Sequence, residues 1–214
     1  MEMPNIEYTG DISKFITTED DMYNNIMYYK DNDFFMDSMN YSKFIKGCER
    51  LVRTSKDYSK FVSVIKNEFG IDYCQVSPKI HDVDTQIEMH HGPLFTLYDI
   101  CEVITNYFLM SNFKVNSFRI ANQVMQEHWD LRVQVIMLST TNHEAVHNRD
   151  IFINYNQAIG DIDSFIKRYT PYLSDEQKYK IWNYFNLCNN NPAFAKSFDR
   201  GILDLDYVKK YIKL

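Results

Sequence analysis

Glycine and proline are scarce in this chain of 214 residues, which contains six of the first and five of the second. Because a β-sandwich or barrel needs these residues at its many turns, their scarcity favours long helices. The sequence also lacks an apolar run long enough to span a bilayer, and no leader peptide is recognisable. We therefore expect a helical protein that does not contact a membrane and that lies in a cytoplasm.

The cysteines form no recognisable motif. The four cysteines, Cys48, Cys74, Cys101 and Cys188, lie far apart, and no two are spaced as CxxC. This spacing excludes a zinc knuckle and a dithiol redox motif. We predict free thiols in a reducing compartment, with at least two of them in the core.

Positive charge is limited, since the net charge is −6, but it is gathered locally. Residues 1–40 hold nine acids and two bases, whereas residues 41–69 hold seven bases and three acids. Lys46, Arg50 and Arg53 recur at i, i+4 and i+7, so a helix would place them on one face. Such a basic stripe is a candidate phosphate-binding surface, and the alternative is an ordinary solvated face.

Hydrophobic spacing predicts an α+β protein that is mainly helical. Apolar residues recur at helical spacing over 41–54, 57–69, 96–111, 117–130, 157–169, 174–188 and 203–212. Residues 85–91 and the branched apolar run over 132–139 read as strands, and Thr140 or Thr141 can cap a helix after the second strand. We divide the chain into an acidic extension (1–40), a helical segment with the basic stripe (41–84), a ββα core (85–150) that contains a helical insert (94–130), and a C-terminal helical region (151–214).

Histidine is the most informative residue type. Four of the six histidines lie in two short runs, 88–91 and 142–147. His143 and His147 are four residues apart, so they share one face of a helix, and His90 and His91 end a predicted strand. Imidazole is a common ligand of borderline metals, so a strand and a helix side by side could form a metal site. We interpret the two isolated histidines, His81 and His128, as surface or hydrogen-bonded core residues.

These two runs resemble the HNH family of ββα-metal nucleases. In that family the first strand ends in a Glu-x-His-His motif, which residues 88–91 match. The helix after the second strand often begins His-Glu-Ala-x-His, which residues 143–147 match. The chain departs from the family in its long insert and in lacking the zinc-knuckle cysteines. The resemblance implies a small ββα-metal centre and a metal-dependent endonuclease that cleaves DNA.

The resemblance also implies a role for each residue. His90, His143 and His147 would hold one divalent ion (Mg, Mn, Zn or Ni), in an arrangement similar to that of the nuclease colicins. His91 would be the general base that activates water. Glu88 and Gln134 (where the family has a bracing asparagine) would support the site. Independently of the resemblance, Arg149 lies just beyond His147 and is a candidate phosphate contact, and DNA would be contacted by the basic stripe of Lys46, Arg50 and Arg53.

Two other functions fit the same residues. His143–His147 is a literal HExxH, the zinc metalloprotease signature, in which Glu144 would be the base. Against this, Arg149 lies where such a helix is usually apolar, and His90 and His91 would have no role. The second alternative is a non-catalytic structural or protein-binding module that uses its helical regions, for example a decayed nuclease.

A composition rich in Asn, Tyr and Lys favours a bacterial or phage genome, and for a phage protein the location would be the host cytoplasm. The oligomeric state is left open.

Overall fold

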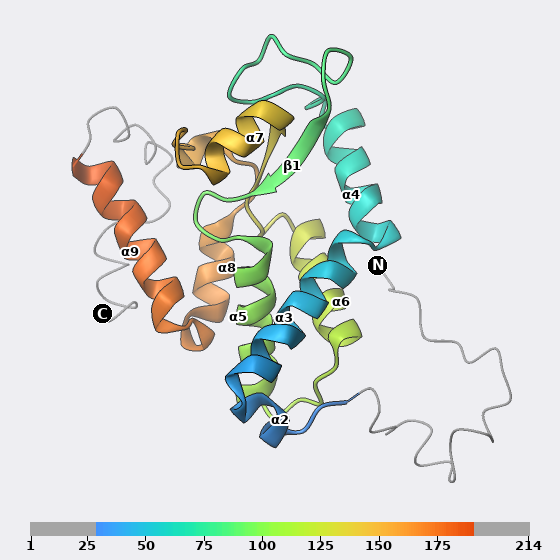
Figure 1. Ribbon diagram of the computed structural model, residues 1–214, viewed down its shortest axis with the longest axis vertical. Helices are drawn as coiled ribbons and strands as arrows, with labels where there is room; N and C mark the ends of the chain where they lie inside the picture. The colour runs from blue at the N-terminus through green and yellow to red at the C-terminus, as the bar shows by residue number, and fades with distance from the viewer. Residues whose placement is uncertain (1–28, 191–214) are drawn as a thin grey trace, which may run out of the picture.

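Three long helices form the centre of the molecule: α3 (Ser38–Arg53), α5 (Leu97–Met110) and α6 (Ser117–Trp129), each in contact with the other two (Figure 1). The computed structural model describes residues 29–190. The predicted helix over 203–212 and most of the acidic extension lie outside the described residues. Each central helix begins at a side-chain cap that accepts a backbone N–H, and Thr96 forms a capping box with Asp99 at the start of α5. Because all three helices turn their apolar faces inward, the core lies between them.

The other elements surround this centre. In chain order they are α2 (Asn32–Met36), α4 (Lys56–Asn67), α7 (Thr140–His147), a 3-10 turn (Tyr155–Gln157), α8 (Ile162–Tyr169), a second 3-10 turn (Thr170–Tyr172) and α9 (Asp175–Asn190). Figure 1 shows α8 and α9 on one side of the central helices, α4 on the other, and α2 at the opposite end of the molecule from α7. No helix within residues 29–190 is long and apolar enough to cross a membrane.

The described part of the chain has one sheet, in which β1 (Ile87–His91) pairs antiparallel with β2 (Val135–Ser139). Every residue of β2 is buried, because α7 packs on the strand and core residues surround it. In β1, by contrast, buried and half-buried residues alternate. The fold is therefore mainly helical α+β with a small two-stranded sheet, as predicted. The division of the chain at residues 40, 84 and 150 stays a prediction.

Two predicted helix boundaries were wrong. Ser139 caps α7 by accepting a hydrogen bond from the N–H of Asn142, and Thr140 is already helical. The helix predicted from 157 begins only at Ile162, because Ile159 pairs with Val135 along the edge of β2 and Gly160 then turns the chain. All four cysteines are free and buried, which confirms that at least two of them lie in the core. The reducing compartment stays a prediction.

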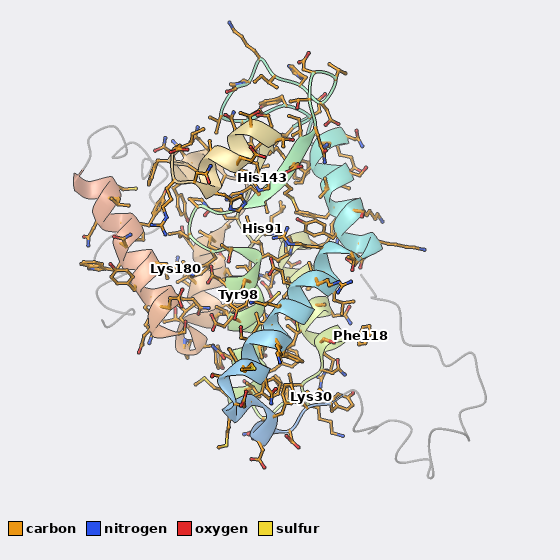
Figure 2. All side chains as sticks on the ribbon, viewed as in Figure 1. Lys30, His91, Tyr98, Phe118, His143 and Lys180 are labelled. Carbon is orange, nitrogen blue, oxygen red and sulfur yellow. The ribbon has the colours of Figure 1, made fainter. Side chains whose placement is uncertain are left out.

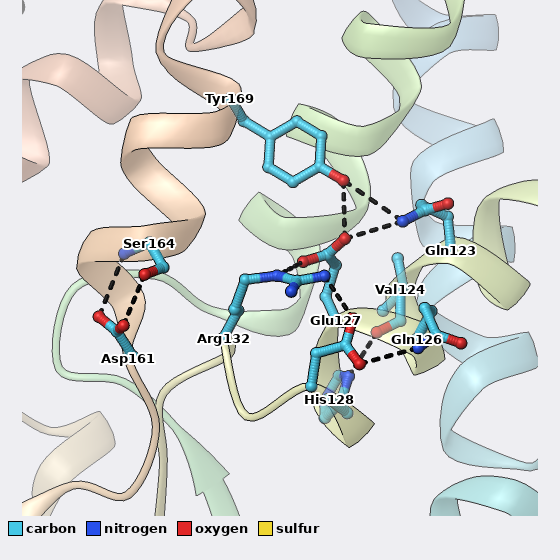
Figure 3. A network of polar contacts seen from close by, with 10 residues as sticks. Gln123, Val124, Gln126, Glu127, His128, Arg132, Asp161, Ser164 and Tyr169 are labelled. Atoms are coloured by element: carbon cyan, nitrogen blue, oxygen red, sulfur yellow. Dashed lines mark hydrogen bonds and ion pairs between the residues drawn. The ribbon is translucent and has the colours of Figure 1, made fainter.

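A buried carboxylate joins α6 to α8 and to the segment before β2 (Figure 3). Glu127 is fully buried, and its Oε2 accepts a hydrogen bond from Nε of Arg132 at 2.5 Å. Its Oε1 accepts hydrogen bonds from the hydroxyl of Tyr169 and from the amide of Gln123, both at 2.8 Å. A buried charge is tolerated only when it is paired and hydrogen-bonded, so this network fixes where α8 docks on α6.

Arg132→Ala is expected to lower the free energy of unfolding by about 2 kcal/mol, because it leaves the Glu127 carboxylate buried without a cation. The cost should stay below that of a fully stripped ion pair, since Tyr169 and Gln123 still donate to the carboxylate. Urea denaturation measures it. Lys178→Ala is the matched control. It removes the ion pair between Lys178 and the exposed Asp175, and should cost less than about 0.5 kcal/mol. Equal losses for the two variants would contradict the role given to Glu127.

Candidate metal centre

The alternation of β1 places two polar side chains on the face that α7 covers. Ile87, Met89 and His91 are buried on the core side of the strand, whereas Glu88 and His90 are half-buried on the other. Because α7 follows β2 directly, its first turns lie over this outer face of the sheet. The same pairing places Glu88 opposite Leu138 and His90 opposite Ile136.

His90, His143 and His147 meet at this point, and we call them the histidine trio. His143 and His147 share the sheet-facing side of α7, and their Nε2 atoms are 3.1 Å apart. The ring of His90 lies 5.0 Å from that of His143 and 5.1 Å from that of His147, centroid to centroid. One nitrogen from each ring lies within 4.8 Å of the other two. The structure therefore brings together the three residues that the sequence predicts as metal ligands.

Two further observations bear on the state of these rings, namely a contact of His143 and the pKa of His90. The carboxylate of Glu88 lies 2.6 Å from Nδ1 of His143. A carboxylate can only accept, so Nδ1 carries the hydrogen and the lone pair of a neutral ring lies on Nε2, toward the trio. Burial and the neighbouring His143 and His147 lower the pKa of His90 to about 4, so this ring is neutral near pH 7.

His91 lies on the opposite face of the strand from the trio, in the core. The strand stays regular through His91, and the chain turns only afterwards, at Gly92. Figure 2 shows the labelled His91 and His143 at separate levels. Nε2 of His91 lies 2.9 Å from Nε2 of His128, and the ring of His91 stacks on Tyr58. Only 4% of His91 is exposed, and its ring faces the core on the other side of the strand. The structure therefore does not bring the predicted general base together with the trio.

The His91–His128 pair was missed at the level of sequence. His128 Nδ1 lies 2.7 Å from the carbonyl oxygen of Val124, an acceptor, so Nδ1 must donate and Nε2 must accept. His91 therefore donates from Nε2, and its Nδ1 has no hydrogen-bond partner among the described residues. The only signal was the place of His128 on the apolar face of α6, one turn after Val124. Isolated His81 lies at the surface, as predicted, beside Asp72 and with 46% of its side chain exposed.

The other predicted site residues lie apart from the trio's centre. Gln134 is buried and donates its amide to the carbonyl of Tyr155, while its own backbone carbonyl accepts from Gly92. Arg149 is exposed just beyond α7, where its positive φ of 67° ends the helix. Two bonds close that end, from the N–H of Arg149 to Val146 and from the N–H of Asp150 to Ala145. A contact of Arg149 with a phosphate stays a prediction.

The basic stripe lies on α3. Lys46, Arg50 and Arg53 are all exposed, and Arg53 makes an ion pair of 2.9 Å with Glu49. The stripe is therefore accessible, and one of its three charges already has a partner.

The HExxH motif does not have the geometry of a zinc metalloprotease site. Glu144 is exposed, and the third residue beside His143 and His147 is the upstream His90.

The fold and site thus define a mainly helical α+β protein with three histidines gathered on a two-stranded sheet. Residues 4–213 match the family of bacteriophage G278-like virion proteins, and the chain belongs to this family. No curated protein and no solved structure matches the chain.

This membership corrects the sequence-based identification. The chain is not a member of the HNH family. The predicted DNA endonuclease activity is also wrong, because the family to which the chain belongs is one of virion proteins. The role of His91 as a base rested on that resemblance. Two short motifs carried the resemblance, whereas the family match extends over nearly the whole chain. A strand and a helix that gather histidines are a local solution that unrelated chains can reach, so the motif does not fix the function.

Proposed function

We propose that the chain is a non-catalytic structural component of the phage particle, which acts by binding other virion proteins. The observation that carries this proposal is the family match over residues 4–213. The placement of His91 supports it, because a base buried against His128 has no access to a water at the trio. The expected location changes accordingly, from the host cytoplasm to the particle. DNA contact through Lys46, Arg50 and Arg53 is a separate prediction on which this proposal does not depend.

One end of the molecule has the character of a protein-binding surface. Four large apolar side chains are exposed there: Met36, Met39, Met110 and Phe113. Met36 lies in α2, Met39 in α3, Met110 at the end of α5, and Phe113 three residues beyond that end. Tyr41 of α3 reaches Asn106 of α5 with a hydrogen bond of 2.6 Å. We call these four residues the methionine end. Flexible, polarisable methionines suit surfaces that pack against a protein partner.

The test uses the phage that encodes the chain. Mass spectrometry of purified particles should find the chain at a fixed number of copies per particle. Met36→Asp combined with Met110→Asp should lower incorporation at least tenfold, because it puts charge into the contact. Val83→Asp is the control, since Val83 is 94% exposed in the loop at the other end of the molecule (Figure 1).

Particles that lack the chain, together with metal-dependent cleavage of DNA by the purified protein, would overturn the proposal. Incorporation of both variants at the wild-type level would keep the structural role but exclude the methionine end as the contact. Circular dichroism of each variant establishes that it is folded before incorporation is compared.

A further inference from the structure

We propose that the histidine trio binds one transition-metal ion of the zinc class, with a fourth coordination position open to solvent, and that this ion fastens α7 to β1. The inference goes beyond the proposed function and does not depend on it. It rests on three observations: the distances within the trio, the contact of Glu88 with His143, and the weak packing of α7.

The distances fit a single ion. Ligand nitrogens each about 2.1 Å from a tetrahedral ion lie about 3.4 Å apart. The two Nε2 atoms on α7 are 3.1 Å apart, and small side-chain rotations would bring His90, already within 4.8 Å, into the same shell. A trio made only of imidazoles selects Zn²⁺, Ni²⁺, Co²⁺ or Cu²⁺ over Mg²⁺ and Ca²⁺, which prefer oxygen. Because His147 is exposed, the fourth position faces solvent.

Glu88 occupies the place of an outer-shell partner. Ligating histidines usually donate their second ring N–H to a carboxylate, which fixes the tautomer and raises the basicity of the ligand nitrogen. Glu88 makes this contact with His143 at 2.6 Å, from the same strand that carries His90. Gly92 leaves room for the ring, since a side chain there would place its Cβ 3.1 Å from Nε2 of His90.

The packing of α7 gives the ion a structural role. The helix has eight residues and none of them is buried, although Val146 packs partly against the core. A helix this short is marginal by itself, and burial of an apolar face normally supplies the stability. An ion held by His90 of β1 and by His143 and His147 of α7 would supply a cross-link between the two elements.

The experiment uses the full chain without a purification tag, freed of metal by a chelator. Calorimetric titration with ZnCl2 should give one site per chain, and MgCl2 should give none. A hundredfold excess of Zn²⁺ over Kd should raise Tm by about 5–10 °C. Addition of Co²⁺ should produce the visible absorption of a four-coordinate ion with nitrogen ligands.

His147→Ala is the primary variant, because the residue is exposed and the fold should survive its loss. It should weaken Zn²⁺ binding at least a hundredfold and abolish the shift in Tm. His81→Ala, which removes a half-exposed histidine outside the trio, should bind as the wild type does. Glu88→Gln should weaken binding by about 10- to 100-fold without changing the stoichiometry.

The proposal is overturned if the wild type and His147→Ala bind Zn²⁺ equally, or if the cobalt complex is six-coordinate. Incorporation into particles is measured on the same variants. Loss of metal binding with normal incorporation would leave the proposed function intact, so failure of one proposal is distinguishable from failure of the other.

Discussion

Replacing Gly160 by alanine is expected to lower the free energy of unfolding by more than about 3 kcal/mol, or to prevent folding altogether. Gly160 has a φ of +110°, which L-residues rarely adopt. An added Cβ would lie 2.2 Å from the carbonyl oxygen of Val133 and 2.9 Å from its carbonyl carbon. Both are backbone atoms next to β2, so relief requires moving the strand.

The surroundings of Gly160 leave little freedom for that movement. Ile159 makes two backbone hydrogen bonds with Val135, at 2.7 and 2.9 Å, and the N–H of Asp161 donates to the carbonyl of Leu131 at 2.6 Å. A shift at residue 160 would strain these bonds, which hold α8 to the edge of the sheet. The loss is therefore expected to appear as lower global stability and not as a local change.

Gly47→Ala is the matched control, and urea denaturation measures both variants. Gly47 lies inside α3, and nothing lies within 4 Å of a Cβ added there. Alanine at this position should stabilise the protein by about 0.5–1 kcal/mol through its higher helix propensity. A loss of less than about 1 kcal/mol for Gly160→Ala would show that the close approach to Val133 is relieved cheaply.

The sequence predicted the fold where the pattern is local. The α3, α5 and α6 helices were predicted because their apolar residues repeat every three to four positions, and β2 because its apolar run is continuous. The start of α8 could not be predicted. It depends on the pairing of Ile159 with Val135, a contact between distant segments that leaves no mark in the local pattern.

The same distinction holds for the site. The i, i+4 spacing of His143 and His147 and the end of β1 at His90 suffice to predict that three imidazoles gather. The side of β1 on which His91 lies depends on whether the strand bends before or after it, and a resemblance suggested the wrong answer. Its contact with His128 joins two elements 37 residues apart, which spacing does not encode.

The stability of the metal-free protein is expected to fall as the pH drops from about 6.5 to about 4. Burial lowers the pKa of His128 from 6.5 to about 4 and that of His91 well below its usual value. In this range the unfolded chain takes up protons that the folded chain excludes. Protonation therefore lowers the free energy of the unfolded state relative to the folded state. His128 alone would account for a loss of about 3 kcal/mol, reached near pH 4 and absent above pH 7.

The contact between the two rings adds to burial in opposing protonation of the folded state. His128 uses Nδ1 on Val124 and accepts from His91 at Nε2, so an added proton would set two donors against each other. At His91 the free position is Nδ1, which is buried and has no acceptor among the described residues. Either proton would require the pair to separate inside a core that includes Phe61 and Tyr58.

The carboxyl of Asp163 opposes this trend and must be separated from it. Burial raises its pKa to about 6, so the folded state holds a proton that the unfolded state has released. The resulting stabilisation of the folded state grows as the pH falls through 6.

A comparison of variants removes the contribution of Asp163, because all of them keep this residue. The double variant His91→Leu/His128→Met replaces both partners by apolar groups of similar size and should lose at least about 3 kcal/mol less than the wild type between pH 7.5 and 4.5. His81→Ala keeps the buried pair and should follow the wild type. Urea denaturation in EDTA at several pH values measures all three proteins, and parallel curves for the wild type and the double variant would show that the pair is not the source of acid sensitivity.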